Sequence, residues 1–268
     1  MFELDSQSLD ELALCIQECG SLAKERQGYI HRSFKDDGSV LTETDLEISS
    51  IVEKKVEKLF PECTFISEEF PNIRKEDSPY LFVLDPIDGT DVYSQGLPSF
   101  AVSLGILNDR LEPVGAMISC PRFGIGKESL FVRLDPGKKL LVDGKPVEIE
   151  GDKDDVRQIV VGSNAARRMD FTAFRGKTRC FGSSIIHLLC PVLFSAIQAS
   201  VVPPCFVWDI ASAHAVLKHV GMDIDFADGE RFTYTEEFVY EKKKFRMDIF
   251  AGSDKARKDL MGLLPLKV

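Results

Sequence analysis

Residues 80–91 read YLFVLDPIDGTD and place two acids at the end of an apolar run. The apolar residues at the start of this stretch predict a strand that is too hydrophobic to be exposed. Pro86 stiffens the exit from the strand, and Asp88 with Gly89 predicts a tight turn. Asp85 and Asp88 should therefore meet beside a buried edge, where two partly desolvated anions repel each other unless a cation or strong hydrogen-bond donors compensate.

Further acids flank other predicted elements. Glu68 and Glu69 follow a short apolar strand, and Asp209 follows the only tryptophan, in CFVWDIA, at the start of a predicted helix. All of them could converge on one edge of the fold. Carboxylate oxygens suit Mg²⁺ or Mn²⁺, and the sequence has no cysteine and histidine cluster that would favour zinc.

Gly89 and Thr90 add an element that suits phosphate. A turn that opens a short helix presents free backbone N–H groups and a positive dipole end to an anion. Metal ions and amides together suit two-metal hydrolysis of a phosphate ester, in which one ion lowers the pKa of the attacking water and another neutralises charge on the leaving oxygen. Taken singly, each motif is more typical of a structural role: Asp-Gly of a turn, Glu-Glu of a solvated rim, and Trp-Asp of a packed indole beside a helix N-cap. Their conjunction favours the functional interpretation.

The regions around this stretch predict helices first and then a sheet. Ser8 with Glu11, and Thr44 with Glu47, have the form of capping boxes, and apolar residues recur at helical spacing after each pair. Turn signals between the later strands favour antiparallel neighbours. The expected helices span 9–23 and 46–59, and the expected strands span 64–66, 80–84, 100–107, 114–119 and 129–134.

The second half of the chain predicts an α/β layer. The charged stretch 150–155 (EGDKDD) has almost nothing to bury, so we expect a boundary there between residues 1–150 and residues 151–268. The apolar stretch 185–202 raises the question of a membrane span, but Pro191 and the lack of a basic flank favour a buried helix that breaks near the proline. The expected strands span 159–161, 222–226 and 247–251, and the expected helices span 167–175, 185–199 and 209–221.

The composition excludes some functions. Acidic residues (43) outnumber basic ones (33), and the net charge of -10 disfavours nonspecific binding to nucleic acid or anionic membranes. Any anionic substrate therefore needs cations supplied locally. The seven cysteines, without a C-x-x-C pair, indicate reduced thiols in a cytoplasmic protein, and the acidic start does not match a secretory signal. We expect His187 and His214 to be structural, and the lysine-rich stretch 241–244 to be a solvated face.

With these motifs in hand, the sequence resembles the inositol monophosphatase family, within the lithium-sensitive, Mg²⁺-dependent phosphatases that also include fructose-1,6-bisphosphatases and bisphosphate nucleotidases. The resemblance runs over nearly the whole chain, and DPIDGT with WDIA at this separation is highly specific. The motifs that carry it are KDDGSVLTETD (35–45), FISEE (65–69), DPIDGT (85–90), RCFGSS (179–184) and WDIA (208–211).

The resemblance implies an α+β and α/β fold, a layered αβαβα sandwich that usually forms homodimers. It implies direct in-line attack on a small phosphate ester by a metal-activated water, with two or three Mg²⁺ ions, or Mn²⁺ in their place, and no phosphoenzyme. The implied metal ligands are Glu68, Asp85, the main-chain carbonyl of Ile87, Asp88 and Asp209. The implied catalytic residues are Asp45, Thr90 and Glu68, of which the first two orient the water. The implied substrate-binding residues are Asp88, Gly89, Thr90, Gly182, Ser183, Ser184 and Asp209. The N-terminal half would carry most metal ligands, and the C-terminal half Asp209 and the substrate-recognition loops.

The sequence departs from the inositol-specific pattern where substrate is recognised. Aligned without gaps from Trp208, Gln198 and Val202 stand where inositol phosphatases have acids, the second of which would bind an inositol hydroxyl. Ser184 stands where alanine is usual, and residues 91–93 read Asp-Val-Tyr in place of Thr-Asn-Phe. The expected substrate is inositol monophosphate or a related sugar or polyol phosphate. Fructose 1,6-bisphosphate and 3'(2'),5'-bisphosphate nucleotides are the alternatives.

Three other interpretations fit less well. Haloacid-dehalogenase phosphatases use the first Asp of Asp-x-Asp-Gly-Thr as a nucleophile, but Pro86 occupies that position. A Ca²⁺ loop beginning at Asp85 would need Glu at its twelfth position, which is Gly96. An inactive, metal-binding scaffold remains an alternative, although every metal ligand that the resemblance implies is present.

Overall fold

The computed structural model describes residues 3–35, 38–72, 74–124, 126–147 and 155–267. The helices in these ranges are α1 (Ser6–Arg26), the 3-10 helix η1 (Gln27–Tyr29), α2 (Glu43–Leu59), α3 (Thr90–Ser94), α4 (Ala165–Arg168), α5 (Ser184–Leu193), α6 (Ala211–His219), α7 (Glu236–Tyr240) and α8 (Asp254–Leu263). The strands are β1 (Ser33–Phe34), β2 (Val40–Leu41), β3 (Thr64–Ser67), β4 (Tyr80–Asp88), β5 (Ala101–Asn108), β6 (Pro113–Cys120), β7 (Leu130–Leu134), β8 (Leu141–Val142), β9 (Lys145–Pro146), β10 (Gln158–Val161), β11 (Lys177–Arg179), β12 (Ala199–Val202), β13 (Asp223–Phe226) and β14 (Ile249–Gly252).

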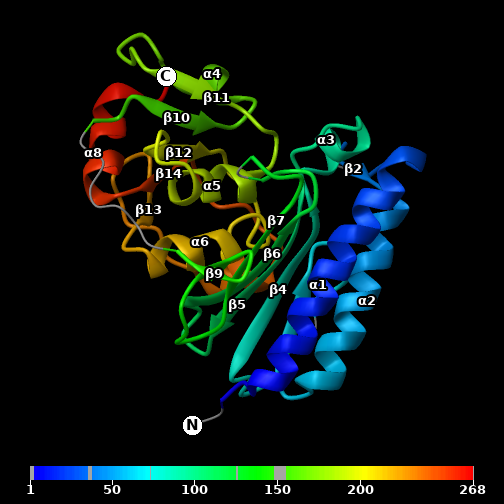
Figure 1. The fold of residues 1–268 in the computed structure, drawn as a ribbon. Helices are drawn as coiled ribbons and strands as arrows, with labels where there is room; N and C mark the ends of the chain where they lie inside the picture. Colours follow the sequence, from blue (N-terminus) through cyan, green and yellow to red (C-terminus); the bar gives the residue numbers. More distant parts are fainter. Residues whose placement is uncertain (1–2, 36–37, 73, 125, 148–154, 268) are drawn as a thin grey trace.

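Helices and sheets alternate in layers (Figure 1). Helices α1 and α2 cover the outer face of one sheet, α5 and α6 lie between that sheet and a second, and α8 packs on the far face of the second sheet. The layers follow from the period of the strands, because alternate side chains point to opposite faces. In β4, Phe82 and Leu84 join the core beneath α1 and α2, whereas Leu81 and Val83 join the core around α5 and α6. This confirms the αβαβα sandwich that the resemblance implies.

The larger sheet confirms the antiparallel centre that the turn signals predict. In the described part of the chain it has seven strands in the order β3-β4-β5-β6-β7-β8-β9. Only the β3–β4 pair is parallel, and each later pair is antiparallel. Strand β4 lies near one edge and carries Asp85 and Asp88 at its end.

The second sheet is mixed, with the order β11-β10-β12-β14-β13 among the described residues. Strand β10 is parallel to β11 and β12, and β14 is antiparallel to β12 and β13. The stretch 150–155, predicted as a boundary, lies outside the described residues except for Asp155. The division of the chain at residue 150 therefore stays a prediction.

Two helix predictions in the second half are wrong in extent. The helix expected over 185–199 ends at Leu193, two residues after Pro191, and residues from Ala199 form a strand between β10 and β14. The helix expected over 167–175 is the short α4, because Met169 has extended backbone and bridges Leu266. Both errors reflect tertiary pairing that overrides local propensity.

The helix caps also differ from the sequence prediction. Helix α1 is capped by Asp5, whose side chain accepts hydrogen bonds from the amides of Gln7 and Ser8 at 3.0 Å each. Helix α2 does begin with a capping box, but it joins Thr42 to Asp45. The same spacing occurs twice in 42–47, so the pattern alone does not select the pair. The consequence for Asp45 is that one of its oxygens is held in place by the start of α2.

Helix α6 packs closely against the larger sheet. A Cβ atom at Gly105 would lie 2.8 Å from the amide nitrogen of Ser212, so only glycine fits here. Ser103, two residues earlier in β5, is hydrogen bonded to Ser212 through its hydroxyl. This contact fixes the start of α6, and with it the preceding turn, against the strand beside β4.

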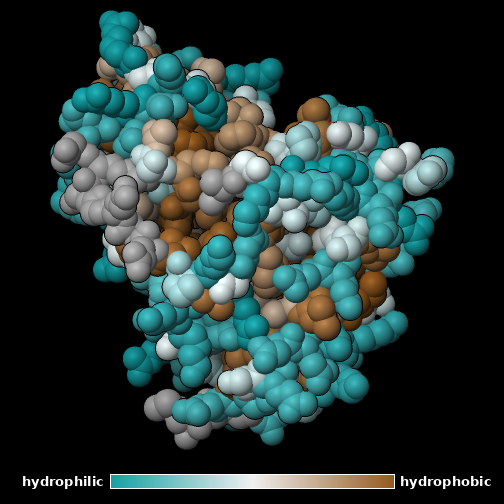
Figure 2. All heavy atoms as spheres, viewed as in Figure 1, coloured by the Kyte–Doolittle hydropathy of each residue, from teal (hydrophilic) through white to brown (hydrophobic). Residues whose placement is uncertain are grey.

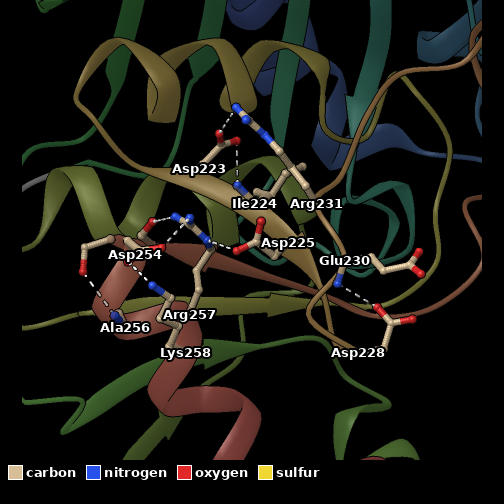
Figure 3. A network of polar contacts seen from close by, with 12 residues as sticks. Asp223, Ile224, Asp225, Asp228, Glu230, Arg231, Asp254, Ala256, Arg257 and Lys258 are labelled. Carbon is tan, nitrogen blue, oxygen red and sulfur yellow. Dashed lines mark hydrogen bonds and ion pairs between the residues drawn. The ribbon is translucent and has the colours of Figure 1, made fainter.

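A polar network joins β13 to β14 and α8 (Figure 3). The Arg257 guanidinium donates to Asp225, and its Nη1 donates to the carbonyl of Gly252 at 2.7 Å. Arg231 lies 3.5 Å from Asp223, and Lys258 pairs with Asp254 on the surface of α8. The acids in this part of the fold therefore have cationic partners.

Apolar residues reach the surface in the hollow over α5, between the end of the molecule that carries β10 and β11 and the strands β6 and β7 (Figure 2). The rest of this face is mostly hydrophilic. No helix in the described residues has both the length and the hydropathy of a membrane span.

Candidate active site

Two of the predicted acids leave the same strand. Asp85 pairs with Ser103 and Asp88 with Ala101 across β5, with a bulge between the two acids. In a regular strand, residues three positions apart point to opposite faces, but a bulge re-aims the side chains. Pro86 lies within the bulge, where its missing N–H breaks no ladder hydrogen bond. The DPID sequence therefore builds the irregularity that brings the two carboxylates together.

Asp209 completes a cluster of three acids. It lies in the turn before α6, where its Oδ2 accepts a hydrogen bond from the amide of Phe206 at 2.6 Å. Asp85, Asp88 and Asp209 each offer a carboxylate oxygen, and these oxygens lie within 4.8 Å of one another. Asp85 and Asp88 are 1% and 3% exposed. Across the described ranges, no lysine, arginine or histidine forms an ion pair with any of the three.

The cluster is electrostatically strained. Burial raises the pKa of Asp88 to about 7, although hydrogen bonds from Ser183, Ile185 and Ser184 lower it. Burial also raises the pKa values of Asp85 and Asp209 well above their usual range, and the neighbouring acidic charges add to the rise.

One oxygen of the cluster is orphaned. Oδ1 of Asp85 is buried and has no hydrogen-bond partner within the described residues. Buried polar atoms normally have partners, so an unpaired carboxylate oxygen among mutually repelling acids fits a ligand for a cation. Three hard oxygen donors in one place fit Mg²⁺ or a similar divalent ion.

Asp88 also caps the start of α5. The Ser183 hydroxyl donates to its carboxylate, as do the amides of Ser184 at 3.1 Å and Ile185 at 2.9 Å. A negative charge at a helix N-terminus is favourable because it meets free amides and the positive dipole end. Of the residues predicted to bind substrate, Ser183 and Ser184 thus contact Asp88 directly, and Gly182 lies beside them.

Gly89 allows the two segments to meet. Its φ of 87° is left-handed, and a Cβ atom here would lie 3.1 Å from the carbonyl oxygen of Gly182 and 3.2 Å from Cβ of Ser183. A side chain at Gly89 would therefore be strained in backbone and crowded by the 182–183 segment. The short helix α3 follows at once, as the sequence predicts.

Asp45 and Thr90 lie together beside this turn. Thr90 Oγ1 is 2.8 Å from the carbonyl oxygen of Ile87 and 3.5 Å from Oδ1 of Asp45. Oδ2 of Asp45 accepts hydrogen bonds from the amide and hydroxyl of Thr42. Burial raises the pKa of Asp45 to about 7, Glu68 adds to the rise, and the Thr42 hydrogen bonds oppose it. The structure therefore brings residues 45, 87 and 90 together, and their roles stay predictions.

Similarity to known proteins identifies the family of this chain. The model of the inositol monophosphatase family matches residues 9–253. The chain belongs to the inositol monophosphatase family. Members of this family are phosphatases that hydrolyse phosphate monoesters. Among its relatives, "Inositol monophosphatase 3" of Solanum lycopersicum is 24% identical over 266 residues, which covers 91% of this chain and 95% of that protein.

Solved structures share the fold. The extragenic suppressor protein SuhB of Bartonella henselae has a TM-score of 0.78 at 19% identity, and the match covers 96% of this chain and 98% of that one. A structure described as an IMPase/NADP phosphatase complexed with Mg²⁺ and phosphate has a TM-score of 0.77 at 15% identity. This match covers 96% of this chain and 95% of that one.

In this inositol monophosphatase family member, Glu68 forms an ion pair with Lys35. Lys35 Nζ lies 2.6 Å from Oε1 of Glu68 and 2.7 Å from Oε1 of Glu69. Burial raises the pKa of Glu68, Lys35 lowers it, and Glu69 raises it. Glu68 is not one of the three clustered carboxylates, but its charge raises the pKa values of Asp85 and Asp209.

A cavity of about 360 Å³ opens on Glu68 and Asp209. Lys242 and Lys244 also line it. Lys242 is half-buried, so the prediction of a solvated face is wrong for this lysine, whereas the prediction holds for the exposed Lys244. It also holds for Lys243, which is 55% exposed and pairs with Glu237 and Glu241. The sequence shows only a run of lysines, and it does not show that neighbouring lysines have different surroundings.

His187 has the structural role that was predicted, but it acts close to the site. Its Nε2 accepts hydrogen bonds from the amides of Phe181 at 2.9 Å and Gly182 at 3.3 Å. Burial lowers the pKa of His187 to about 4, which keeps the ring neutral and able to accept. His187 therefore positions the segment that packs on Gly89.

Proposed function

We propose that this chain is a Mg²⁺-dependent phosphatase that hydrolyses inositol monophosphate or a related sugar or polyol phosphate without a phosphoenzyme. The observation that carries the proposal is the buried cluster of Asp85, Asp88 and Asp209, whose charges have no ion-pair partner in the part of the chain that the structure describes. Such a cluster destabilises a fold unless a ligand neutralises it, and strongly perturbed carboxylates mark functional sites.

The proposed metal ligands are the side chains of Glu68, Asp85, Asp88 and Asp209 with the carbonyl oxygen of Ile87. They would hold two or three Mg²⁺ ions, with Mn²⁺ as a substitute. When bound, such ions lower the pKa of a water and neutralise charge on the leaving oxygen of an ester.

Asp45 and Thr90 are proposed to orient the attacking water. The 3.5 Å separation of Thr90 Oγ1 and Oδ1 of Asp45 leaves Oδ1 available to accept a proton, while Thr42 holds Oδ2. Burial and neighbouring acids raise the pKa of Asp45 to about 7, which is the range in which a general base works best near neutral pH. The amides of Gly89 and Thr90 are proposed to bind the phosphate.

The first experiment tests catalysis. Phosphate release from a panel of sugar, polyol and nucleotide phosphates should require Mg²⁺ or Mn²⁺ and stop with EDTA. Asp88→Asn should reduce turnover by at least about 10²-fold with the fold intact, because it removes a charge from the metal site. Asp109→Asn, in the exposed turn after β5, is the matched control and should keep full activity. Near-normal activity of Asp88→Asn would refute the assignment of this carboxylate.

Gln198 and Val202, which stand where inositol phosphatases have acids, do not bind inositol in this fold. Val202 is buried in the centre of the second sheet, and Gln198 accepts hydrogen bonds from the amides of Arg157 and Gln158, so both side chains are committed to structure. A comparison of kcat/KM for inositol 1-phosphate with that for other phosphate esters tests this directly.

A further inference from the structure

The segment 242–244 places two lysines at the mouth of the proposed active site. Lys242 and Lys244 line the cavity of about 360 Å³ that also contains Glu68 and Asp209, whereas Lys243 does not. A cavity of this size lies at the lower end of the range for small-molecule sites, roughly 300–1,000 Å³. The two cations therefore face whatever enters beside the carboxylate cluster.

Both lysines are held by neutral groups. Lys242 Nζ donates to the main-chain carbonyl of Glu68 at 2.7 Å and lies 5.4 Å from the centre of the Trp208 ring. Lys244 Nζ lies 4.9 Å from the centre of the Phe206 ring. Neither lysine forms an ion pair within the described residues. Lys242 is thus held by a hydrogen bond and Lys244 lies against a ring, while the charges of both remain available.

The acids whose charges act on the two lysines are Glu69, which pairs with Lys35, and the proposed metal ligands Glu68 and Asp209. The charges of Glu68 and Glu69 act on Lys242, and the charge of Lys244 acts on Asp209. If Glu68 and Asp209 bind divalent ions, their negative charge is neutralised there, and the two ammonium groups are left to face the substrate. An uncharged polyol offers these groups no countercharge.

We propose that Lys242 and Lys244 bind a second anionic group, so that the preferred substrates are phosphate monoesters that carry another phosphate or a carboxylate. This inference rests on the proposed function, since it places the first phosphate at the carboxylate cluster. The Phe206 ring is stacked on Trp208 at 4.8 Å and also contacts Lys244, which favours a sugar or polyol over a nucleotide whose base would need to stack.

The test compares matched substrates. Phosphate release by the full chain in Mg²⁺ is measured for fructose 1,6-bisphosphate against fructose 1-phosphate, and for 3-phosphoglycerate against glycerol 3-phosphate. The wild type should favour the member with the additional anion in each pair. The variant with both Lys242→Gln and Lys244→Gln should lose about tenfold in kcat/KM on that member, mainly through KM, as expected for charge-assisted contacts at a partly exposed site. The members with one anionic group should change less than twofold.

The control is Lys243→Gln, which removes the same charge from the same segment outside the cavity. It should leave both preferences unchanged. An unaltered preference in the double variant would overturn the subsite, as would an equal loss on both members of a pair. If the wild type hydrolyses no substrate, the proposed function fails instead. The affinity for fructose 1,6-bisphosphate, measured by calorimetry in Ca²⁺, then tests the subsite. If the two lysines bind the second anion, the double variant binds this ligand more weakly than Lys243→Gln does, and equal affinities would overturn the subsite.

Discussion

The clustered acids of the active site and the acids beside β13 and β14 differ in whether the fold gives them cationic partners. Asp225 pairs with Arg257, and the buried Asp248 pairs with Arg168 at 2.7 Å. Asp85, in contrast, has a buried oxygen without a hydrogen-bond partner among the described residues and lies among other acids. Both regions place carboxylates away from water, but within the described residues the chain pairs Asp225 and Asp248 with cations and forms no ion pair with Asp85, Asp88 or Asp209.

The pKa shifts follow this difference. Burial works to raise the pKa of Asp223, yet the hydrogen bond and charge of His214 lower it below its usual range. Burial raises the pKa of Asp88 to about 7 because the donors around it do not offset desolvation and like charges. The comparison teaches that burial alone does not mark a functional acid. The marker is burial without a countercharge, which leaves a site ready for an external cation.

The largest expected effect comes from removing the carboxylate charge of Asp85, which has no ion-pair partner within the described residues. Asp85→Asn should lower kcat/KM by about 10²–10³-fold, because it removes a proposed metal ligand. In EDTA the same variant should be more stable than the wild type by about 1–2 kcal/mol, since an unpaired buried charge is lost. Enzyme assays and urea unfolding measure the two effects. If Asp85→Asn were less stable than the wild type in EDTA, the charge of Asp85 would have to be compensated by other groups of the protein.

The reverse result is expected beside β13. Arg257→Met should lower the free energy of unfolding by about 3 kcal/mol, because it leaves Asp225 without its cation and the carbonyl of Gly252 without its donor. Equilibrium unfolding in urea measures this loss. The double variant with Asp225→Asn should recover part of it, and no recovery would mean that the ion pair is not the cause.

A smaller effect should appear as a pH dependence. Burial raises the pKa of Asp88 from its ordinary value to about 7, so the stability linked to its proton is present at low pH and is lost as pH rises through 7. In EDTA, the wild type should lose about 2 kcal/mol relative to Asp88→Asn between pH 5.5 and pH 8. The difference between the two proteins cancels the titration of His187 and His214. A constant difference would contradict the raised pKa.

The smallest effect is expected at the surface of α8. Lys258 and Asp254 form an ion pair, but their side chains are 69% and 67% exposed. Lys258→Met should change the free energy of unfolding by less than about 0.5 kcal/mol, because water and salt screen such pairs. The same urea titration detects the change. If Lys258→Met lowered the free energy of unfolding as much as Arg257→Met, burial could not explain why the two cations contribute differently to stability.

Much of the site could be predicted because its residues come in short, ordered motifs. Strand β4 with its Asp-Pro-x-Asp-Gly exit, and Asp209 just before a helix, were readable from local patterns. The cap of α2 was not, because the spacing of the capping box recurs within a few residues. The cap of α1 was missed because Asp5 caps the helix without a capping box. The break of α5 near Pro191 was predicted, but the strand that begins at Ala199 was missed, because the apolar residues after Pro191 fit a buried strand as well as a helix.

The amino-acid sequence by itself determined the types of residue that make the site: hard oxygen ligands, a glycine turn, and apolar strands to bury them. Only the tertiary structure decided which charges are left without partners. The lysines at 242 and 243 are neighbours of the same chemistry, yet one lines the cavity and the other pairs with Glu237 and Glu241. The reason is that electrostatic energy depends on distance and burial, and both are set by segments far apart in the chain.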